Sequence, residues 1–172
     1  MGRHGAVTFK GNPLTLVGEE VKVGGPAPDF DLIHFKGGMN HIRKADLLGK
    51  PTIISVVPSL DTPVCQVQTK TFNGRLAALG DKINALTVSL DLPFAMNRFC
   101  GAESITALKA GSDYMDRSFG TDWGVLIDEL KILARGVFVL DADGIVRYAQ
   151  VVKEVADEPD YDAALAAIEK LV

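Results

Sequence analysis

The stretch "TIISVVPSLDTPVCQVQ" (Thr52–Gln68) places the pattern of a buried strand directly before the start of a helix. Its first part, Thr52–Val57, is rich in apolar and β-branched side chains, which is typical of a strand buried on both faces. A helical pattern continues from Val64 to about Leu79, and a second apolar run, Asn84–Leu90, follows it. Strand, helix and strand in this order predict two parallel strands joined by a right-handed crossover.

Shorter segments with strand or helix patterns lie on both sides of this unit, and together they favour one α/β domain with helices packed around a central sheet. The expected strands are Val7–Lys10 and Leu14–Val17 (a hairpin), Phe30–Ile33, Met39–Ile42, Ser104–Leu108, and Val137–Leu140 and Ile145–Gln150 (a hairpin around "DADG"). The expected helices are Lys44–Lys50, Leu92–Phe99 and Pro159–Val172.

The composition is that of an ordinary globular protein of one domain. The chain has 172 residues, of which 47% are hydrophobic and 23% charged. The net charge of −4, from 18 basic and 22 acidic residues, argues against nucleic acid as a partner. The longest apolar stretches have the length of strands, so we expect no membrane-spanning helix. The first residues lack the apolar core of a signal peptide, and we therefore expect a cytoplasmic protein.

Cys65 stands where a helix begins. Thr62 is a good N-cap residue and Pro63 suits the first helical position, so Cys65 falls in the first turn. The helix N-terminus favours a negative charge there, and its free N–H groups form an anion site. These neighbours favour a nucleophilic cysteine. The other interpretation is a buried cysteine that packs as a small hydrophobic residue.

A second cysteine, Cys100, follows the second predicted strand. The carboxyl ends of parallel strands lie at one edge of the sheet, so the topology brings Cys65 and Cys100 to the same edge, where α/β proteins build their sites. Chance proximity is an alternative. None of the three histidines has a metal-ligand spacing with either cysteine.

Two phrases of the sequence resemble the peroxiredoxins. The stretch "SVVPSLDTPVCQVQTKTFN" contains their Pro-x-x-x-Thr-x-x-Cys pattern at Pro58, Thr62 and Cys65. The phrase "DLPFAMNRFCGAE" (Asp91–Glu103) is similar to the bacterial thiol peroxidase branch, the atypical two-cysteine peroxiredoxins. The resemblance covers nearly the whole chain from about Val7, and we expect residues 1–6 of the single domain 1–172 to be flexible.

The resemblance implies a thioredoxin-like fold with a central mixed sheet, flanking helices and an added N-terminal β-hairpin. It also implies a peroxidase that reduces hydrogen peroxide and organic hydroperoxides with electrons from thioredoxin, forms a homodimer and needs no haem or metal. From the short apolar stretches we expect no membrane partner. In the family pattern Cys65 is the peroxidatic cysteine and Cys100 the resolving cysteine, and the two form an intramolecular disulfide. Thr62 and Arg135 are the catalytic partners, and Pro58 shields the pocket.

Without the resemblance the supporting residues have simpler interpretations. Arg135 is typical of a surface arginine before a strand, Thr62 of a helix cap and Pro58 of a strand terminator. Two other functions use similar residues. A thiol–disulfide oxidoreductase normally carries a Cys-x-x-Cys pair, which neither cysteine has. A redox sensor or binding module could use the same cysteine switch to signal.

Overall fold

The strand Thr52–Val56 (β5) is an interior strand of a seven-stranded sheet in the computed structural model, which describes residues 1–172. All five of its side chains are buried. Helix α2 (Pro63–Leu76) connects it to β6 (Asn84–Ser89), which pairs with it in parallel. The predicted crossover unit is therefore confirmed, and with it the burial of β5 on both faces.

The complete sheet is mixed, as expected. Its order is β11-β10-β5-β6-β7-β3-β4, in which only the neighbouring pairs β5–β6 and β6–β7 are parallel. The outer strands are β3 (Asp31–Phe35), β4 (Met39–Arg43), β7 (Lys109–Ser112), β10 (Gly136–Leu140) and β11 (Val146–Val151). The short helix α1 (Lys44–Leu47) follows β4. The chain has a thioredoxin-like fold, and no helix has both the length and the apolar character to span a bilayer.

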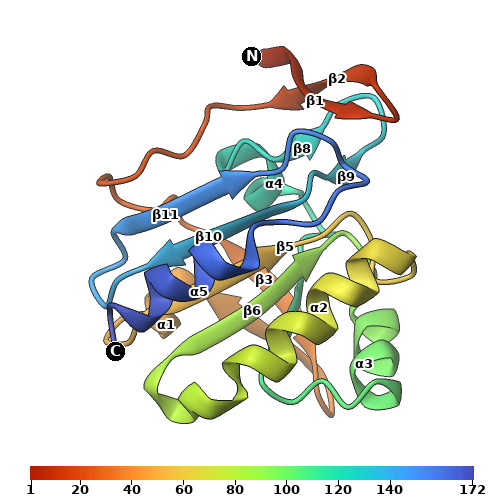
Figure 1. The fold of residues 1–172 in the computed structure, drawn as a ribbon. Helices are drawn as coiled ribbons and strands as arrows, with labels where there is room; N and C mark the ends of the chain where they lie inside the picture. Colours follow the sequence, from red (N-terminus) through yellow and green to blue (C-terminus); the bar gives the residue numbers. More distant parts are fainter.

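Two helices cover one face of the sheet. In Figure 1, α2 and α5 (Tyr161–Glu169) run across the front of the strands. Their buried side chains Phe72 and Leu165 share one core cluster with Ile53 of β5. The next residue of β5, Ile54, points the other way into a second cluster with Phe119 and Trp123. This alternation explains why a strand with no polar face forms the middle of the fold.

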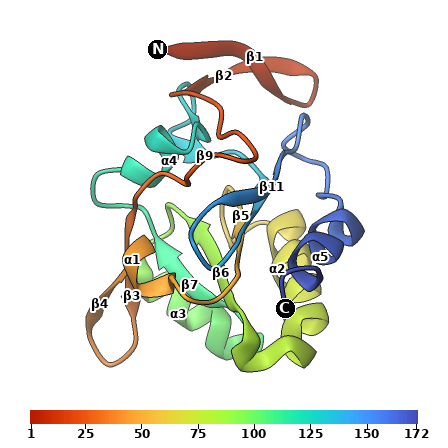
Figure 2. The ribbon, with the colours of Figure 1, turned by 90° about the vertical axis from the view of Figure 1, so that its left-hand side faces the viewer.

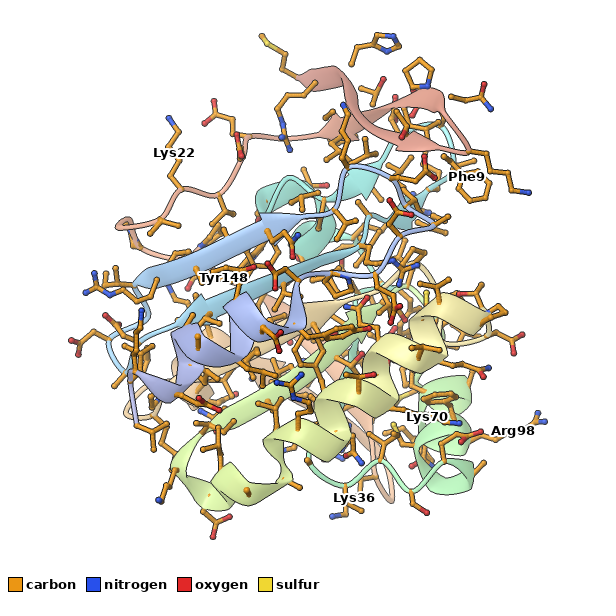
Figure 3. The ribbon with its side chains drawn as sticks, viewed as in Figure 1. Phe9, Lys22, Lys36, Lys70, Arg98 and Tyr148 are labelled. Carbon is orange, nitrogen blue, oxygen red and sulfur yellow. The ribbon has the colours of Figure 1, made fainter.

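A second, four-stranded sheet packs on the opposite face. It consists of β1 (Gly2–Phe9), β2 (Asn12–Val17), β8 (Leu126–Ile127) and β9 (Ile132–Leu133), with α4 (Ser118–Asp122) beside it. Figure 2 shows the β1–β2 hairpin as a separate layer above the rest of the molecule, and Figure 3 shows Phe9 at the end of β1. The N-terminal hairpin is as predicted, but β8, β9 and α4 were not anticipated.

The start of the chain is paired in a strand. β1 begins at Gly2, which pairs with Val17. The Arg3 guanidinium donates hydrogen bonds to the carbonyl oxygens of Gly18 and Gly124 and so ties the first residues to two loops. The sequence of the first six residues does not indicate these hydrogen bonds, because their partners lie far away along the chain.

The strand expected at Ser104–Leu108 is wrong, because β7 begins only at Lys109. The backbone N–H groups of Thr106 and Ala107 donate to the Asn73 side chain on α2, at 2.9 and 2.8 Å. A side chain from a distant helix thus replaces the strand partner that these residues would need. The helix before this loop, α3 (Pro93–Ala102), packs against β7 and β3 and carries Cys100.

Candidate active site

The turn between β5 and α2 sets the position of Cys65. Pro58 is buried directly after the strand, and Thr62 has extended backbone angles as the N-cap of α2. Cys65 follows in the first turn with none of its surface exposed. A substrate therefore reaches the sulfur only when the covering groups move slightly apart.

Thr62 occupies the expected N-cap position but does not cap the helix with its side chain. Its hydroxyl donates to the carbonyl oxygen of Ser59 at 2.9 Å, and its backbone N–H donates to the same oxygen at 3.2 Å. Both bonds close the Ser59–Thr62 turn. They leave the first N–H groups of the helix free of a side-chain acceptor, which suits an anion or a polar substrate.

Arg135 lies directly against Cys65. It precedes β10 and is only 2% exposed, so its interpretation as a surface arginine is wrong. Its Nη1 donates to the Cys65 sulfur at 3.4 Å and to Gln68 Oε1 at 3.0 Å, and its Nε donates to the Val155 carbonyl at 3.0 Å. None of the ion pairs of the protein includes Arg135. Its acceptors are instead the Cys65 sulfur, the Gln68 amide oxygen and the Val155 carbonyl.

Gln68 is the third residue of the buried hydrogen-bonded group that contains Cys65 and Arg135. The sequence alone did not indicate it as a site residue. It is fully buried, and its Nε2 donates to Ser55 Oγ at 2.8 Å and to the Val56 carbonyl at 3.3 Å. These two bonds turn the amide oxygen toward Arg135. A signal was present in the sequence, because residues three apart on a helix share a face and Gln68 is three positions after Cys65.

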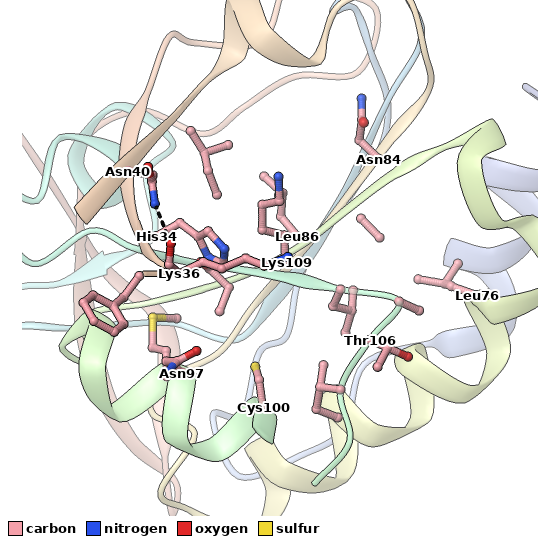
Figure 4. A pocket seen from close by; sticks show the side chains of 18 of the residues that line it. His34, Lys36, Asn40, Leu76, Asn84, Leu86, Asn97, Cys100, Thr106 and Lys109 are labelled. Carbon is pink, nitrogen blue, oxygen red and sulfur yellow. Dashed lines mark hydrogen bonds between the residues drawn. The ribbon is translucent and has the colours of Figure 1, made fainter. Parts of the chain in front are cut away.

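Cys100 approaches the same region from α3. Its sulfur points into a cavity of about 1160 Å³ between α3 and the sheet, as Figure 4 shows, while Cys65 does not line this cavity. Both cysteines are free thiols, and burial raises the pKa of the Cys100 thiol.

The two cysteines also meet the same small apolar cluster. Cys65 belongs to it together with Val57, Leu60 and Met96, and Cys100 packs against it from the side. The structure therefore brings Cys65, Arg135 and Pro58 to one edge of the sheet and places Cys100 next to them on a separate helix. Thr62 is the exception, because its hydroxyl contacts the turn and not Arg135.

Comparison with known proteins gives consistent matches. The Redoxin family model matches residues 22–165. The chain is 51% identical over 166 residues to the thiol peroxidase of Bacillus subtilis (strain 168), covering 96% of this chain and 98% of the relative. It is 47% identical to the thiol peroxidase of Halalkalibacterium halodurans, covering 94% and 96%. A crystal structure of a peroxiredoxin-like protein from Aquifex aeolicus superposes with a TM-score of 0.89 at 39% identity, covering 99% and 100%.

Proposed function

Because the chain belongs to the thiol peroxidases of the Redoxin family, we propose that it reduces hydrogen peroxide and organic hydroperoxides through Cys65, forms a Cys65–Cys100 disulfide and is recycled by thioredoxin. It is a thiol-dependent peroxidase of the peroxiredoxin type. The observation that carries the proposed mechanism is the 3.4 Å contact between the buried Arg135 guanidinium and the Cys65 sulfur.

The first step is attack of the Cys65 thiolate on one peroxide oxygen. An S–O bond forms as the O–O bond breaks, and the leaving alkoxide or hydroxide takes a proton to become alcohol or water. The sulfur loses two electrons and becomes a sulfenic acid, while the peroxide gains them. The fixed positive charge of Arg135 stabilises the thiolate and the negative charge that develops on the leaving oxygen.

Other residues contribute by position. Gln68 and Val155 hold the guanidinium plane from two sides, so no reorganisation is needed when charge moves onto the oxygen. Thr62 supports the turn before the helix, and we propose that its hydroxyl and the first N–H groups of α2 hold the peroxide oxygens. Pro58 limits the access of water by closing the end of β5.

The second step is attack of the Cys100 thiolate on the Cys65 sulfenic acid. An S–S bond forms and the S–O bond breaks, with release of hydroxide that is protonated to water. A dithiol protein such as thioredoxin then reduces the disulfide to two thiols and becomes a disulfide itself. The cycle begins with two free thiols, which suits the reducing conditions of the cytoplasm.

We also propose that the protein acts as a homodimer. Aromatic side chains of residues 112–123 would contribute to a subunit interface only where they are exposed. Phe119 and Trp123 are buried in their own core, whereas Met115 is 69% exposed. Exposed Leu92 and Phe94 at the start of α3 add apolar surface of the kind that subunit contacts bury.

The test is consumption of hydrogen peroxide by the purified protein with thioredoxin, thioredoxin reductase and NADPH. The Cys65→Ser variant should lose activity. The Cys100→Ser variant should complete one turnover, which leaves oxidised Cys65, but should not be recycled by thioredoxin. Continued peroxide consumption by Cys65→Ser would overturn the assignment of the nucleophile. If another dithiol supported turnover and thioredoxin did not, the assignment of thioredoxin as the reductant would be overturned.

A further inference from the structure

A carboxylate outside the proposed peroxide site fixes the turn before α2. Asp91 follows β6 and accepts three hydrogen bonds on its side chain. Ser59 Oγ donates to Oδ1 at 2.7 Å, the Leu60 backbone N–H donates to Oδ2 at 2.7 Å, and Ser89 Oγ donates to Oδ2 at 2.6 Å. Two of the three donors thus belong to the turn that carries Thr62 and leads to Cys65.

The main chain of Asp91 is itself attached to the edge of the sheet. Its N–H donates to Ser89 Oγ at 3.1 Å, and its carbonyl accepts from Ser112 Oγ at 2.5 Å. Ser89 and Ser112 are the last residues of β6 and β7 and are fully buried. Asp91 is therefore held in place by the ends of β6 and β7. The Ser59–Leu60 turn is bound to it by side-chain hydrogen bonds, which can break while Asp91 stays in place.

Asp91 also stands at the start of the helix that carries Cys100. Pro93, the first residue of α3, is two positions further along the chain. A cavity of about 450 Å³ lies between the turn and this helix and is lined by Ser59, Asp61 and Arg98 among others. Figure 3 shows Lys70 of α2 and Arg98 of α3 on the side of the molecule where the two helices meet.

We propose that Asp91 is a positioning residue that holds the Ser59–Thr62 turn in its peroxide-reactive arrangement, and that release of the turn from Asp91 allows Cys65 to reach Cys100. This inference rests on the proposed Cys65–Cys100 cycle. The turn must be ordered for peroxide attack, because Thr62 and the first N–H groups of α2 depend on it. It must loosen for disulfide formation, because each cysteine is held by its own helix.

The proposal predicts opposite effects on the two chemical steps. Hydrogen bonds to a charged acceptor are stronger than neutral ones, and loss of the charge leaves the Leu60 N–H poorly paired. In Asp91→Asn the attack of Cys65 on peroxide should slow by about tenfold. Formation of the Cys65–Cys100 disulfide from the sulfenic acid should become several times faster, because the turn opens more readily.

The two steps can be measured separately in single turnovers. Peroxide attack is followed in the Cys100→Ser background by rapid quenching, trapping of the sulfenic acid and mass spectrometry. Disulfide formation is followed with both cysteines present by quenching with an alkylating reagent. The matched control is Asp61→Asn, which removes the same charge from the same turn, where the Asp61 side chain makes no hydrogen bond or ion pair. It should change neither rate.

Ser59→Ala provides a second variant that removes one donor and leaves Asp91 in place. Like Asp91→Asn, it should slow peroxide attack and speed disulfide formation, but by smaller factors. The variant that combines Asp91→Asn with Ser59→Ala should change each rate by less than the two single changes would together if they acted independently. Equal slowing of both steps, or no change in either, would show that Asp91 is only structural and would overturn the inference. Failure of the unmodified protein to form the Cys65–Cys100 disulfide would instead refute the proposed cycle.

Discussion

Arg135 combines burial with the absence of a carboxylate partner. A buried charge without a counter-charge destabilises a fold unless hydrogen bonds and an anion compensate it. The acceptors present are the Gln68 amide oxygen, the Val155 carbonyl and the Cys65 sulfur. The stability of Arg135 therefore depends on these three acceptors, of which only the Cys65 sulfur is an ionisable group.

Replacement of Arg135 should reduce peroxide attack by more than the loss of thiolate explains. A free thiol is a few per cent ionised at neutral pH, so full ionisation gains at most about 30-fold. The rate of peroxide attack should fall by more than this factor in Arg135→Ala. It should also fall in Arg135→Lys, because lysine keeps the charge but lacks the planar guanidinium group with its two parallel donors. Thiolate absorbance and the rate of attack are measured together over a range of pH.

The control for these variants is Arg98→Ala, since Arg98 is exposed and makes no side-chain hydrogen bond or ion pair. It should leave the rate unchanged. If a pH high enough to ionise the Cys65 thiol fully restored the rate of peroxide attack in Arg135→Ala, Arg135 would act only by promoting ionisation of the thiol.

The two cysteine-bearing helices are attached to their surroundings at different points. The later part of α2 is tied to the loop after α3 by the Asn73 side chain and by the Lys70–Glu103 ion pair of 2.6 Å. The first turn of α2 is held by the Asp91 anchor on the preceding turn and by the contact of the Arg135 guanidinium with the Cys65 sulfur. Movement toward a disulfide should therefore begin in the first turn, while the end of the helix stays in place.

Disulfide formation should change hydrogen exchange in defined segments. The oxidised protein should exchange faster at residues 62–68, at 96–101 or at both, because their backbone bonds must open to bring the sulfurs together. Residues 72–76, next to the Asn73 tie, should exchange alike in both redox forms. Equal protection of all three segments in the two forms would show that the disulfide forms without unwinding.

Unwinding near Cys100 has a chemical consequence as well. Burial raises the pKa of this thiol, so a smaller fraction of it is thiolate in the folded helix than in an exposed cysteine at the same pH. Exposure removes the desolvation and restores the ordinary ionisation of a cysteine. In the proposed cycle, the resolving thiolate would therefore form more readily once the segment opens.

At the scale of the whole molecule, the N-terminal hairpin supports the site from the opposite face of the sheet. The Thr8 carbonyl accepts from the Val155 N–H at 2.8 Å, and the Val155 carbonyl accepts from Arg135. The neighbouring Glu154 carboxylate accepts from the Thr8 hydroxyl at 2.7 Å and from the backbone N–H groups of Lys10 and Gly11. The hairpin and the guanidinium are therefore attached to the same short segment.

The hairpin attachment should weaken in acid. The Thr8 hydroxyl and then the backbone N–H groups lower the pKa of Glu154 from 4.5 to about 2. A depressed pKa contributes stability that is complete above pH 4.5 and is lost as the pH falls toward about 2. Glu154→Gln should be less stable at neutral pH and should lose part of this acid dependence, as measured by denaturant unfolding at several pH values.

The matched control is Glu20→Gln, because the exposed Glu20 side chain has no hydrogen-bond partner. It should keep the acid dependence of the unmodified protein. Identical pH profiles for Glu154→Gln and the unmodified protein would contradict the proposed role of this carboxylate.

The contiguous sequence determined the β5–α2–β6 unit, the helix start at Thr62–Pro63, the position of Cys65 and the presence of a second cysteine at the same sheet edge. These features depend on burial patterns and on interactions between residues a few positions apart, which a short stretch contains in full. The β10–β11 hairpin was predictable for the same reason, since Asp141 accepts from Asp143 and Ile145 within its own turn.

Only the tertiary structure decided which distant groups complete the site. Arg135 meets Cys65 across 70 positions, Gln68 finds its partners on β5, and Asp91 holds a turn about 30 residues before it. The loop before β7 and the β8–β9 pair likewise depend on distant partners, namely the Asn73 side chain and the N-terminal hairpin. Such contacts depend on how the sheet, helices and loops pack together, and packing is a property of the whole chain that no local pattern contains.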